Sequence, residues 1–324
     1  MCSERSGSNL ITSLAGSLPG VSAPPPTHLF RLFANCGPNY GDLELDANWR
    51  TLIADVADNF RAKLGEWTTT VDEAELLTRA TRRDALELLR IIYAKEAAED
   101  GARHSFVKEN HTHTFAGQLS QAFPDCRFVM MVRDPRDVAS SWVRTDSIPG
   151  GVEKAIDVWL HDQTHALPVF NHLQESGRGL FLRYEDLIAD PRQALMVLAD
   201  FIGVPFDDAV FEFYRNPRTR SNAARIRAWR NTGRPIMKNN VGGYRKTLTP
   251  LDIRYIELRC RGLMAQFGYV SDGVALDGRA ATEEIDRLKP LLTQGRYLIE
   301  DEREIAIRRR RLDALERVLE RRLP

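Results

Sequence analysis

Residues 127–142 read Arg127-Phe-Val-Met-Met-Val-Arg133-Asp-Pro-Arg136-Asp137-Val-Ala-Ser140-Ser141-Trp142, and this stretch decides the fold. Its unbroken apolar run, Phe128 to Val132, predicts a strand that is buried on both faces. The following residues, 133–137, are polar and contain a proline, so the strand must end there. Residues 138–143 resume an apolar pattern that suits a helix, which Asp134 or Asp137 can cap. A strand, a basic turn and a helix in this order place anion-binding groups at the carboxyl edge of a parallel sheet.

Arg133 and Ser141 can bind a phosphate together in this arrangement. The guanidinium supplies a fork of charged donors, and the hydroxyl, about one turn inside the helix, supplies one more. Taken alone, Arg133 is equally well explained by a surface ion pair, because arginines at strand ends often pair with carboxylates.

The segment Arg133-Asp-Pro-Arg-Asp-Val-Ala-Ser-Ser141 resembles the 3′-phosphate-binding motif of sulfotransferases that use 3′-phosphoadenosine-5′-phosphosulfate (PAPS). These enzymes move a sulfuryl group from PAPS to an acceptor hydroxyl or amine. The resemblance implies that Arg133 and Ser141 hold the 3′-phosphate of PAPS, the co-substrate. It also implies an α/β fold with a P-loop-like three-layer parallel sheet flanked by helices, a helical insert and a C-terminal helical tail.

A small, polar loop at residues 3–9 precedes an expected helix at 10–18. Such a loop presents backbone N–H groups to an anion. It lacks the second glycine and the Lys-Ser/Thr pair of the nucleotide-triphosphate P-loop. It resembles the 5′-phosphosulfate loop of the same family, which implies donor-binding roles for Arg5, Ser6, Gly7, Ser8 and Asn9. Asn9 departs from the usual hydroxyl residue, but its side-chain amide can still donate a hydrogen bond.

An apolar strand should precede this loop in the expected fold, and only Met1 to Glu4 are available for it. The central strand is therefore expected to be nearly absent. Either the true start lies earlier, or the domain lacks a core strand and is weakened. The sequence leaves both alternatives open.

Lys108 ends a short expected strand at 105–108, and the resemblance implies that it contacts the transferred sulfuryl group. Cytosolic members carry a catalytic histidine two residues later, where this chain has Asn110. The general base therefore cannot be assigned directly, and His111 and His113, just beyond, are two candidates. His28 is the third, because other members carry a glutamate base near residues 25–26. Each histidine is also explained by an ordinary loop or packing role.

Two later segments complete the resemblance. Tyr184 ends the expected strand at 179–184, and the family's tyrosine at this place lies beside the adenine. The stretch Asn239-Asn240-Val241-Gly242-Gly243-Tyr244-Arg245 resembles the element that closes over the nucleotide. Glycine pairs let the backbone approach a ligand. Arg245 is therefore a further candidate for the 3′-phosphate, and a solvated basic loop is the alternative.

The composition excludes several other classes of function. Hydrophobic residues make up 43% and charged residues 28%, while Lys+Arg and Asp+Glu are 45 each. This balance gives no overall field for nucleic acid or acidic lipid. The four cysteines show neither metal nor disulfide spacing, so we expect no metal and a reducing, cytoplasmic location. No segment is apolar enough to predict a membrane span or a secretory signal.

The expected organisation is a sulfotransferase domain at 1–270, a linker at 271–281 and a charged helical tail at 282–324. Three helices at 48–64, 71–77 and 82–98 form an insert, about 43–101, whose position suits an acceptor-binding lid. The tail should place Leu312, Leu315, Leu319 and Leu323 on one face. That face predicts either a homodimer through a two-stranded coil or a helix docked on the body.

The sequence therefore predicts in-line sulfuryl transfer from PAPS to a hydroxyl or amine on a small molecule, glycan or protein, with a general base and no metal. A P-loop phosphotransferase is one rival, but it needs a Lys-Ser/Thr pair and a Mg²⁺ carboxylate, and neither is found. The other rival is a catalytically impaired nucleotide-binding or scaffold protein. The short first strand and the unassigned base favour that rival.

Overall fold

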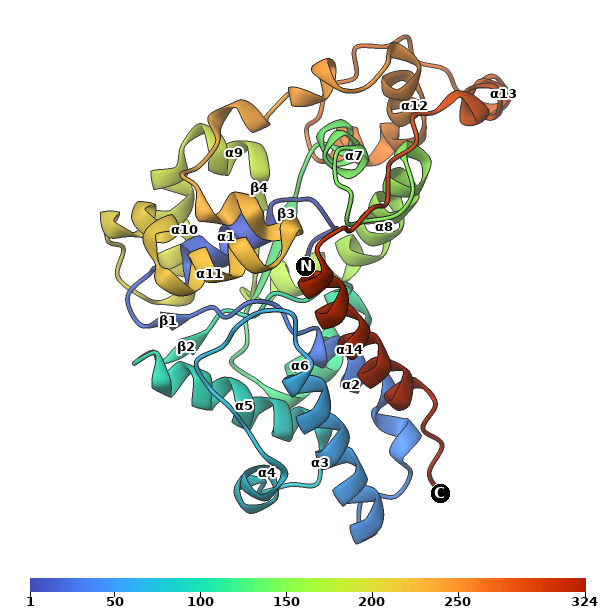
Figure 1. Cartoon of the computed structure of the whole chain (residues 1–324). Coiled ribbons are helices and arrows are strands. Elements are labelled where there is room, and N and C mark those ends of the chain that lie inside the picture. Colours follow the sequence, from blue (N-terminus) through green and yellow to red (C-terminus); the bar gives the residue numbers. More distant parts are fainter. The chain divides into compact units, whose positions relative to one another are not determined.

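The computed structural model describes residues 1–324, and the chain forms two compact units (Figure 1). Unit 1 comprises Met1–Ser8, Phe128–Ala194 and Ile236–Ile299. Unit 2 comprises Asn9–Arg127, Leu195–Pro235 and Glu300–Pro324. No helix combines the length and the apolar composition that crossing a bilayer requires.

Unit 1 is built around a short parallel ladder. Its helices and strands are β3 (Phe128–Val132), α7 (Pro135–Val143), α8 (Val152–Glu175), β4 (Gly179–Arg183), α9 (Tyr184–Ala189), α12 (Pro250–Gln266) and α13 (Gly278–Leu288), and α10 (Pro191–Ile202) begins in it. β3 pairs with β4 in parallel, from Phe128 opposite Gly179 to Val132 opposite Arg183, and Figure 1 shows the two side by side. The predicted strand at 128–132 is confirmed and is buried over most of its length.

The first residues of the chain lie along β3. The Met131 amide donates to the Met1 carbonyl at 2.9 Å, and Cys2 forms an isolated parallel bridge with Met131. The expected central strand is thus present only as a one-residue bridge. Farther along, α7 begins three residues earlier than predicted because Pro135 suits its first turn and the Asp134 carboxylate caps it through the Arg136 amide.

Large side chains from several elements of unit 1 form a single apolar core. Trp159 of α8 is fully buried and lies edge-on to Phe267, with ring centroids 6.1 Å apart. Its indole N–H donates to the carbonyl of Arg133 at 3.0 Å, so the core directly supports the end of β3. The start of α12 is fixed by a capping box between Thr249 and Asp252.

Unit 2 is mostly helical. Its elements are α1 (Ser8–Ala15, except its first residue), β1 (Val21–Ser22), α2 (Leu29–Cys36), α3 (Asp46–Arg61), α4 (Glu73–Arg79), α5 (Ala85–Glu99), β2 (His104–Ser105), α6 (Ala116–Ala122), most of α10, α11 (Pro217–Arg225) and α14 (Glu302–Leu319). The three predicted insert helices are confirmed as α3, α4 and α5, and aspartates cap the last two. β1 pairs with β2 in parallel.

The observed fold is α/β and helix-rich, but the sheet differs from the prediction. The four strands form two separate two-stranded parallel ladders, and the expected continuous three-layer sheet is not confirmed. The predicted strand leading to Lys108 is wrong in extent, because β2 ends at Ser105. Both residues of β2 are exposed, so apolar burial does not stabilise this strand beyond its two residues.

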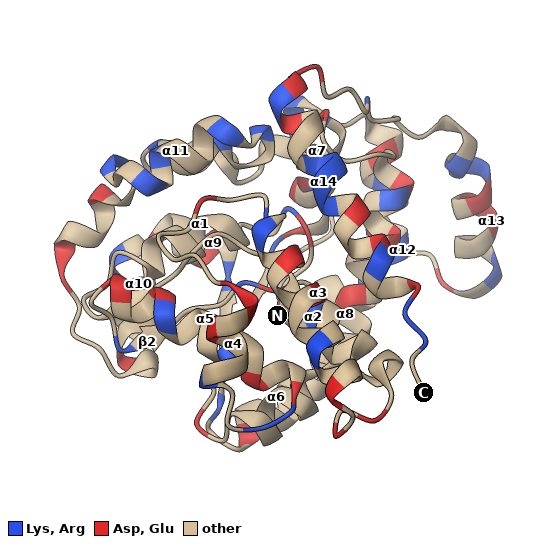
Figure 2. Cartoon of the chain, turned by 60° about the horizontal axis from the view of Figure 1, so that its bottom comes forward, with Lys and Arg blue, Asp and Glu red and all other residues tan.

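The C-terminal helix α14 packs on unit 2, lying along α2 and α3 (Figure 1). Val318 is fully buried in the core of this unit, and Ala314 is buried as well. Of the two predicted alternatives, the helix docked on the body is therefore the one observed. The predicted leucine face is only half right, because Leu315 and Leu323 pack against the core while Leu312 and Leu319 are 53% and 54% exposed. The helix instead turns Ile307, Ala314 and Val318 inward, at intervals of seven and four residues. Figure 2 shows basic and acidic residues interspersed along this helix.

We predict that Val318→Ala lowers the free energy of unfolding by about 1–2 kcal/mol, because it removes buried methyl groups and leaves a small cavity. Leu319→Ala, one residue on, is the matched control and should cost less than about 0.5 kcal/mol. Urea denaturation of the full chain measures both. Equal losses would contradict the docking face.

Candidate functional site

The loop before α1 has the backbone shape of an anion nest. Arg5 and Gly7 both adopt positive φ angles, 65° and 91°, and α1 begins at Ser8. Alternation between right- and left-handed conformations turns successive N–H groups toward one point. Ser6 is fully buried in this loop and its hydroxyl has no hydrogen-bond partner. The loop therefore offers a side-chain donor that nothing in the protein uses.

Gly7 cannot be replaced without moving a neighbour. A Cβ atom at this position would lie 2.3 Å from Cδ2 and 2.7 Å from Cε2 of Tyr184. Tyr184 itself is buried, and its hydroxyl accepts a hydrogen bond from the Asn240 side-chain amide at 2.8 Å. The loop thus rests directly on the ring of the residue that the sequence predicts to lie beside the adenine.

The loop also meets the segment 133–141, as the sequence predicts. The Arg5 Nε donates to the Ser141 hydroxyl at 3.1 Å, and Arg133 Nη1 donates to the Arg5 carbonyl at 3.1 Å. These contacts all lie within unit 1. The two segments that resemble the two phosphate-binding motifs are therefore adjacent in space.

Arg133 is a buried cation with no carboxylate ion pair. It is 3% exposed, and its guanidinium donates to the carbonyls of Arg5 and Asn240, the latter at 2.6 Å. Its Nε is buried without a partner, and the guanidinium carbon lies 4.3 Å from the centre of the Tyr184 ring. Its charge acts on the Asp137 carboxylate, but the two form no ion pair, so the donors of Arg133 meet neutral carbonyl oxygens.

Arg136, three residues later, has the opposite environment. Its guanidinium pairs with Asp134 at 2.7 Å and with Glu257 at 2.6 Å, and all three side chains are buried or nearly so. Its charge is therefore balanced inside the protein. Of the two arginines in the motif, Arg136 is therefore the one that is paired with carboxylates.

Asp137 holds the glycine-rich segment against this motif. Its carboxylate accepts hydrogen bonds from the Gly242 amide at 2.7 Å and the Tyr244 amide at 2.9 Å. Burial raises the pKa of Asp137, while the charge of Arg133 and these amides act in the opposite direction. The sequence suggested Asp137 only as a helix cap, so this role was missed. Neither spacing nor residue type signals a contact across more than a hundred residues.

Arg245 lies at the surface of unit 1. It pairs with Asp272 at 2.6 Å, and the two side chains are 57% and 61% exposed. Its guanidinium also lies 4.6 Å from the centre of the Tyr244 ring. Its expected contact with the 3′-phosphate stays a prediction.

The predicted proton-transfer residues all lie in unit 2. The Nδ1 atom of His28 lies 3.2 Å from Glu109 Oε2, and the two side chains are 18% and 4% exposed. Burial holds the pKa of His28 well below its ordinary value, and the positive charge of Lys108 lowers it further. The rings of His111 and His113 lie 6.1 Å apart, edge to face. Of the three histidines, His28 has a buried carboxylate partner, and sequence analysis missed that partner.

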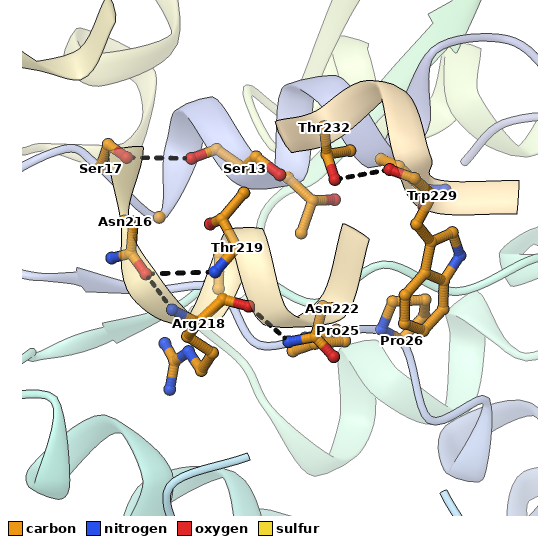
Figure 3. A pocket seen from close by; sticks show the side chains of 14 residues that line it. Ser13, Ser17, Pro25, Pro26, Asn216, Arg218, Thr219, Asn222, Trp229 and Thr232 are labelled. Carbon is orange, nitrogen blue, oxygen red and sulfur yellow. Dashed lines mark hydrogen bonds between the residues drawn. The ribbon is translucent and has the colours of Figure 1, made fainter. Parts of the chain in front are cut away.

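A polar pocket lies in unit 2 between α1, residues 23–26 and α11 (Figure 3). Arg218, on its wall, is already paired with Glu96 at 2.6 Å, and the Asn222 side chain accepts from the Glu66 amide at 2.7 Å. Asn9 also lines the pocket, and its side-chain oxygen is buried without a partner. Because the main polar groups of the wall are satisfied internally, the pocket by itself identifies no ligand.

The chain belongs to the sulfotransferase family, whose sequence model matches residues 1–208. Flavonol 3-sulfotransferase of Flaveria bidentis is 27% identical over 128 residues, which cover 34% of this chain. The match spans 41% of that relative's own length.

Two solved structures have the same fold. The sulfotransferase domain from the Synechococcus PCC 7002 olefin synthase is 20% identical with a TM-score of 0.55, and 83% of this chain covers 93% of that one. The sulfotransferase domain from the curacin biosynthetic pathway is 19% identical with a TM-score of 0.56, and 83% of this chain covers 96% of it. At these identities the likeness establishes the fold.

We predict that Gly7→Ala destabilises the protein by about 1–3 kcal/mol more than Gly20→Ala, because only Gly7 faces a clash. Gly20 is a matched control, since its φ is also positive, at 77°, and a Cβ there meets nothing within 4 Å. Gly20→Ala should therefore show only the backbone cost of about 1 kcal/mol. Thermal and urea unfolding compare the two, and equal losses would show that the loop does not rest on Tyr184.

Proposed function

We propose that this protein is a sulfotransferase that moves a sulfuryl group from PAPS to a hydroxyl or amine acceptor without a metal. The observation that carries the proposal is Arg133, a buried cation that donates to two carbonyls, lies over an aromatic ring and forms no ion pair with a carboxylate. A phosphate would supply charged acceptors in a geometry that a guanidinium matches. Family membership favours the same reading.

In this proposal unit 1 binds the donor nucleotide. Arg133 and Ser141 take the 3′-phosphate, and the Arg5 side chain now bonded to the Ser141 hydroxyl turns to the phosphosulfate. Ser6 and Gly7 supply further donors from the loop, as the expected 5′-phosphosulfate site requires. The remaining members of the expected set are Ser8, Asn9, Tyr184 and Arg245.

The chemistry needs charge stabilisation and one proton acceptor. The acceptor oxygen or nitrogen attacks sulfur, the bond from sulfur to the bridging oxygen breaks, and its electron pair leaves with adenosine 3′,5′-bisphosphate. Lys108, whose positive charge acts on both His28 and Glu109, is proposed to stabilise the sulfuryl oxygens as charge spreads over them. His28, His111 or His113 takes the acceptor's proton. No step requires a metal ion.

The two rival functions make different demands on the same residues. A P-loop phosphotransferase requires a Lys-Ser/Thr pair after the loop, where this chain has Ser8 and Asn9. A scaffold protein would bind the nucleotide and leave every acceptor unmodified. Incubating the protein with radiolabelled PAPS and a cell extract separates these cases and shows which acceptor becomes labelled.

A cytoplasmic location and a homodimer through the exposed side of α14 are further parts of the proposal.

We predict that Arg133→Ala weakens binding of adenosine 3′,5′-bisphosphate by about 10- to 100-fold, the usual worth of a charge-assisted contact. Calorimetry with and without EDTA should show that the wild-type affinity does not depend on Mg²⁺. Arg279→Ala is the control, because that side chain is 92% exposed and should leave affinity unchanged. Unchanged affinity in Arg133→Ala would refute the assignment of the nucleotide site.

We predict that Lys108→Ala lowers the turnover of PAPS by about 100-fold or more while changing the affinity for adenosine 3′,5′-bisphosphate by less than about threefold. The bisphosphate lacks the sulfuryl group, so it cannot report a contact made to that group. Lys63→Ala provides a lysine control elsewhere in unit 2. Equal losses in turnover and affinity would argue against a role for Lys108 at the sulfuryl group.

A further inference from the structure

Glu109, which follows Lys108 in sequence, is a buried carboxylate that the proposed function does not use. Its Oε2 lies 3.2 Å from His28 Nδ1, and its Oε1 accepts the Phe30 amide at 3.2 Å. The Glu109 side chain is 4% exposed while that of His28 is 18% exposed. The carboxylate is therefore enclosed, and one edge of the imidazole reaches the surface.

The backbone of His28 is held in a conformation that costs energy. Its φ and ψ angles are 60° and 24°, in the left-handed region, although it is not a glycine. It occupies the position before α2, yet its side chain makes no capping hydrogen bond to that helix. In this left-handed backbone conformation, the imidazole of His28 contacts Glu109. His111 shares this left-handed conformation, with a φ of 55°, so the contact with Glu109 rather than the strain distinguishes His28.

The C-terminal helix fixes the peptide just before His28. Arg311 of α14 donates through Nη2 to the Thr27 carbonyl at 2.5 Å. The Thr27 hydroxyl lies 3.0 Å from the Tyr93 hydroxyl and accepts the Leu29 amide at 3.3 Å. Thr27 is fully buried, so the chain entering His28 is held by both its carbonyl and its side chain.

We propose that Glu109 is the positioning residue of a His28–Glu109 pair, that Arg311 secures it from the C-terminal helix, and that His28 is therefore the general base. This proposal rests on the proposed sulfotransferase function. In it, Nδ1–H of His28 donates to the Glu109 carboxylate, which leaves the lone pair of Nε2 for the acceptor. The acceptor's proton passes to Nε2 as the acceptor atom bonds to sulfur and the bridging S–O bond breaks. The electron pair of that bond leaves on the 5′-phosphate of adenosine 3′,5′-bisphosphate.

The charges around the pair give it a defined pH dependence. Burial raises the pKa of Glu109 to about 8, and the Phe30 amide together with nearby positive charges opposes that rise. The charged and titratable groups that face the pair are Arg31, Tyr93, Lys108, His111 and Arg311. Protonated Glu109 cannot accept the Nδ1 proton, so the pair is fully formed only above its pKa. The rate of transfer should therefore rise with pH and level off above about pH 8.

The experiment compares Glu109→Gln with wild type in the full chain. The variant keeps the shape of the side chain but removes its charge. We expect kcat for PAPS-dependent transfer to fall about 100-fold with little change in KM, and the rise of kcat/KM near pH 8 to disappear. A variant with wild-type kcat and an unchanged pH profile would overturn the proposal.

Arg311→Met tests the contribution of the C-terminal helix, with Arg310→Met as the matched control. Arg310 is exposed on the same helix, so its loss should leave activity unchanged. Arg311→Met should lower kcat about tenfold, and Arg311→Lys should restore part of it. Equal activities for the 310 and 311 variants would remove Arg311 from the proposal. Melting temperatures of all variants show whether a loss reflects misfolding.

Nitrogen NMR of labelled histidine tests the pair without any acceptor. In the wild type above pH 8, His28 should carry its proton on Nδ1, and Glu109→Gln should shift the tautomer balance toward Nε2–H. A His28 signal that is identical in both proteins would overturn the pairing.

If the wild type shows the Nδ1–H tautomer but transfers nothing from PAPS, the proposed function fails and the pairing stands. If it transfers sulfuryl groups and His28→Ala keeps full turnover, the pairing's catalytic role fails and the function stands.

Discussion

A buried guanidinium needs negative charge or hydrogen-bond acceptors on every side, and unit 1 is organised around one that has only acceptors. Arg133 is buried at the end of β3, where the backbone carbonyls of Arg5 and Asn240 receive its donors. Those carbonyls belong to the two segments that frame the motif. The same cation thus ties the N-terminal loop and the glycine-rich segment to the strand end. An arriving phosphate could replace neutral oxygens with charged ones at the same donors.

The sequence predicts the parts of this architecture that depend on local patterns. The apolar run Phe128–Val132 predicts the strand, and the pattern after it predicts a helix, although α7 begins earlier, at Pro135. The tail is also predicted to be helical, but the structure divides it into α13 and α14 rather than one helix. The sheet is less predictable, because pairing depends on partners far along the chain. The face of α14 was only partly predicted, for the same reason. Leu315 and Leu323 pack against the core of unit 2 as expected, but Leu312 and Leu319 are exposed and the centre of the packed face is Val318.

The candidate site likewise contains residues that short sequence motifs predict and residues that only tertiary packing brings together. Arg133, Ser141 and the loop around Gly7 follow from short motifs, and the structure places them together in unit 1. The spacing of the histidines, by contrast, cannot rank them as bases. The distinguishing feature is a carboxylate about eighty positions away from His28 in sequence, at Glu109. Only tertiary packing brings such a pair together, so no local pattern could reveal it.

The two units present complementary electrostatic problems. In unit 1 a buried cation, Arg133, forms no ion pair, whereas in unit 2 burial raises the pKa of the Glu109 carboxyl group to about 8 although nearby cations oppose that rise. An anionic ligand would stabilise the buried charge of Arg133 most strongly, and a hydrogen-bonding partner that shares a proton would stabilise Glu109 most strongly. The proposed function assigns a use to each feature, because it includes a highly charged nucleotide and the removal of one proton. Buried charged groups often stabilise a fold no better than apolar side chains of similar volume, so stability alone does not account for either feature.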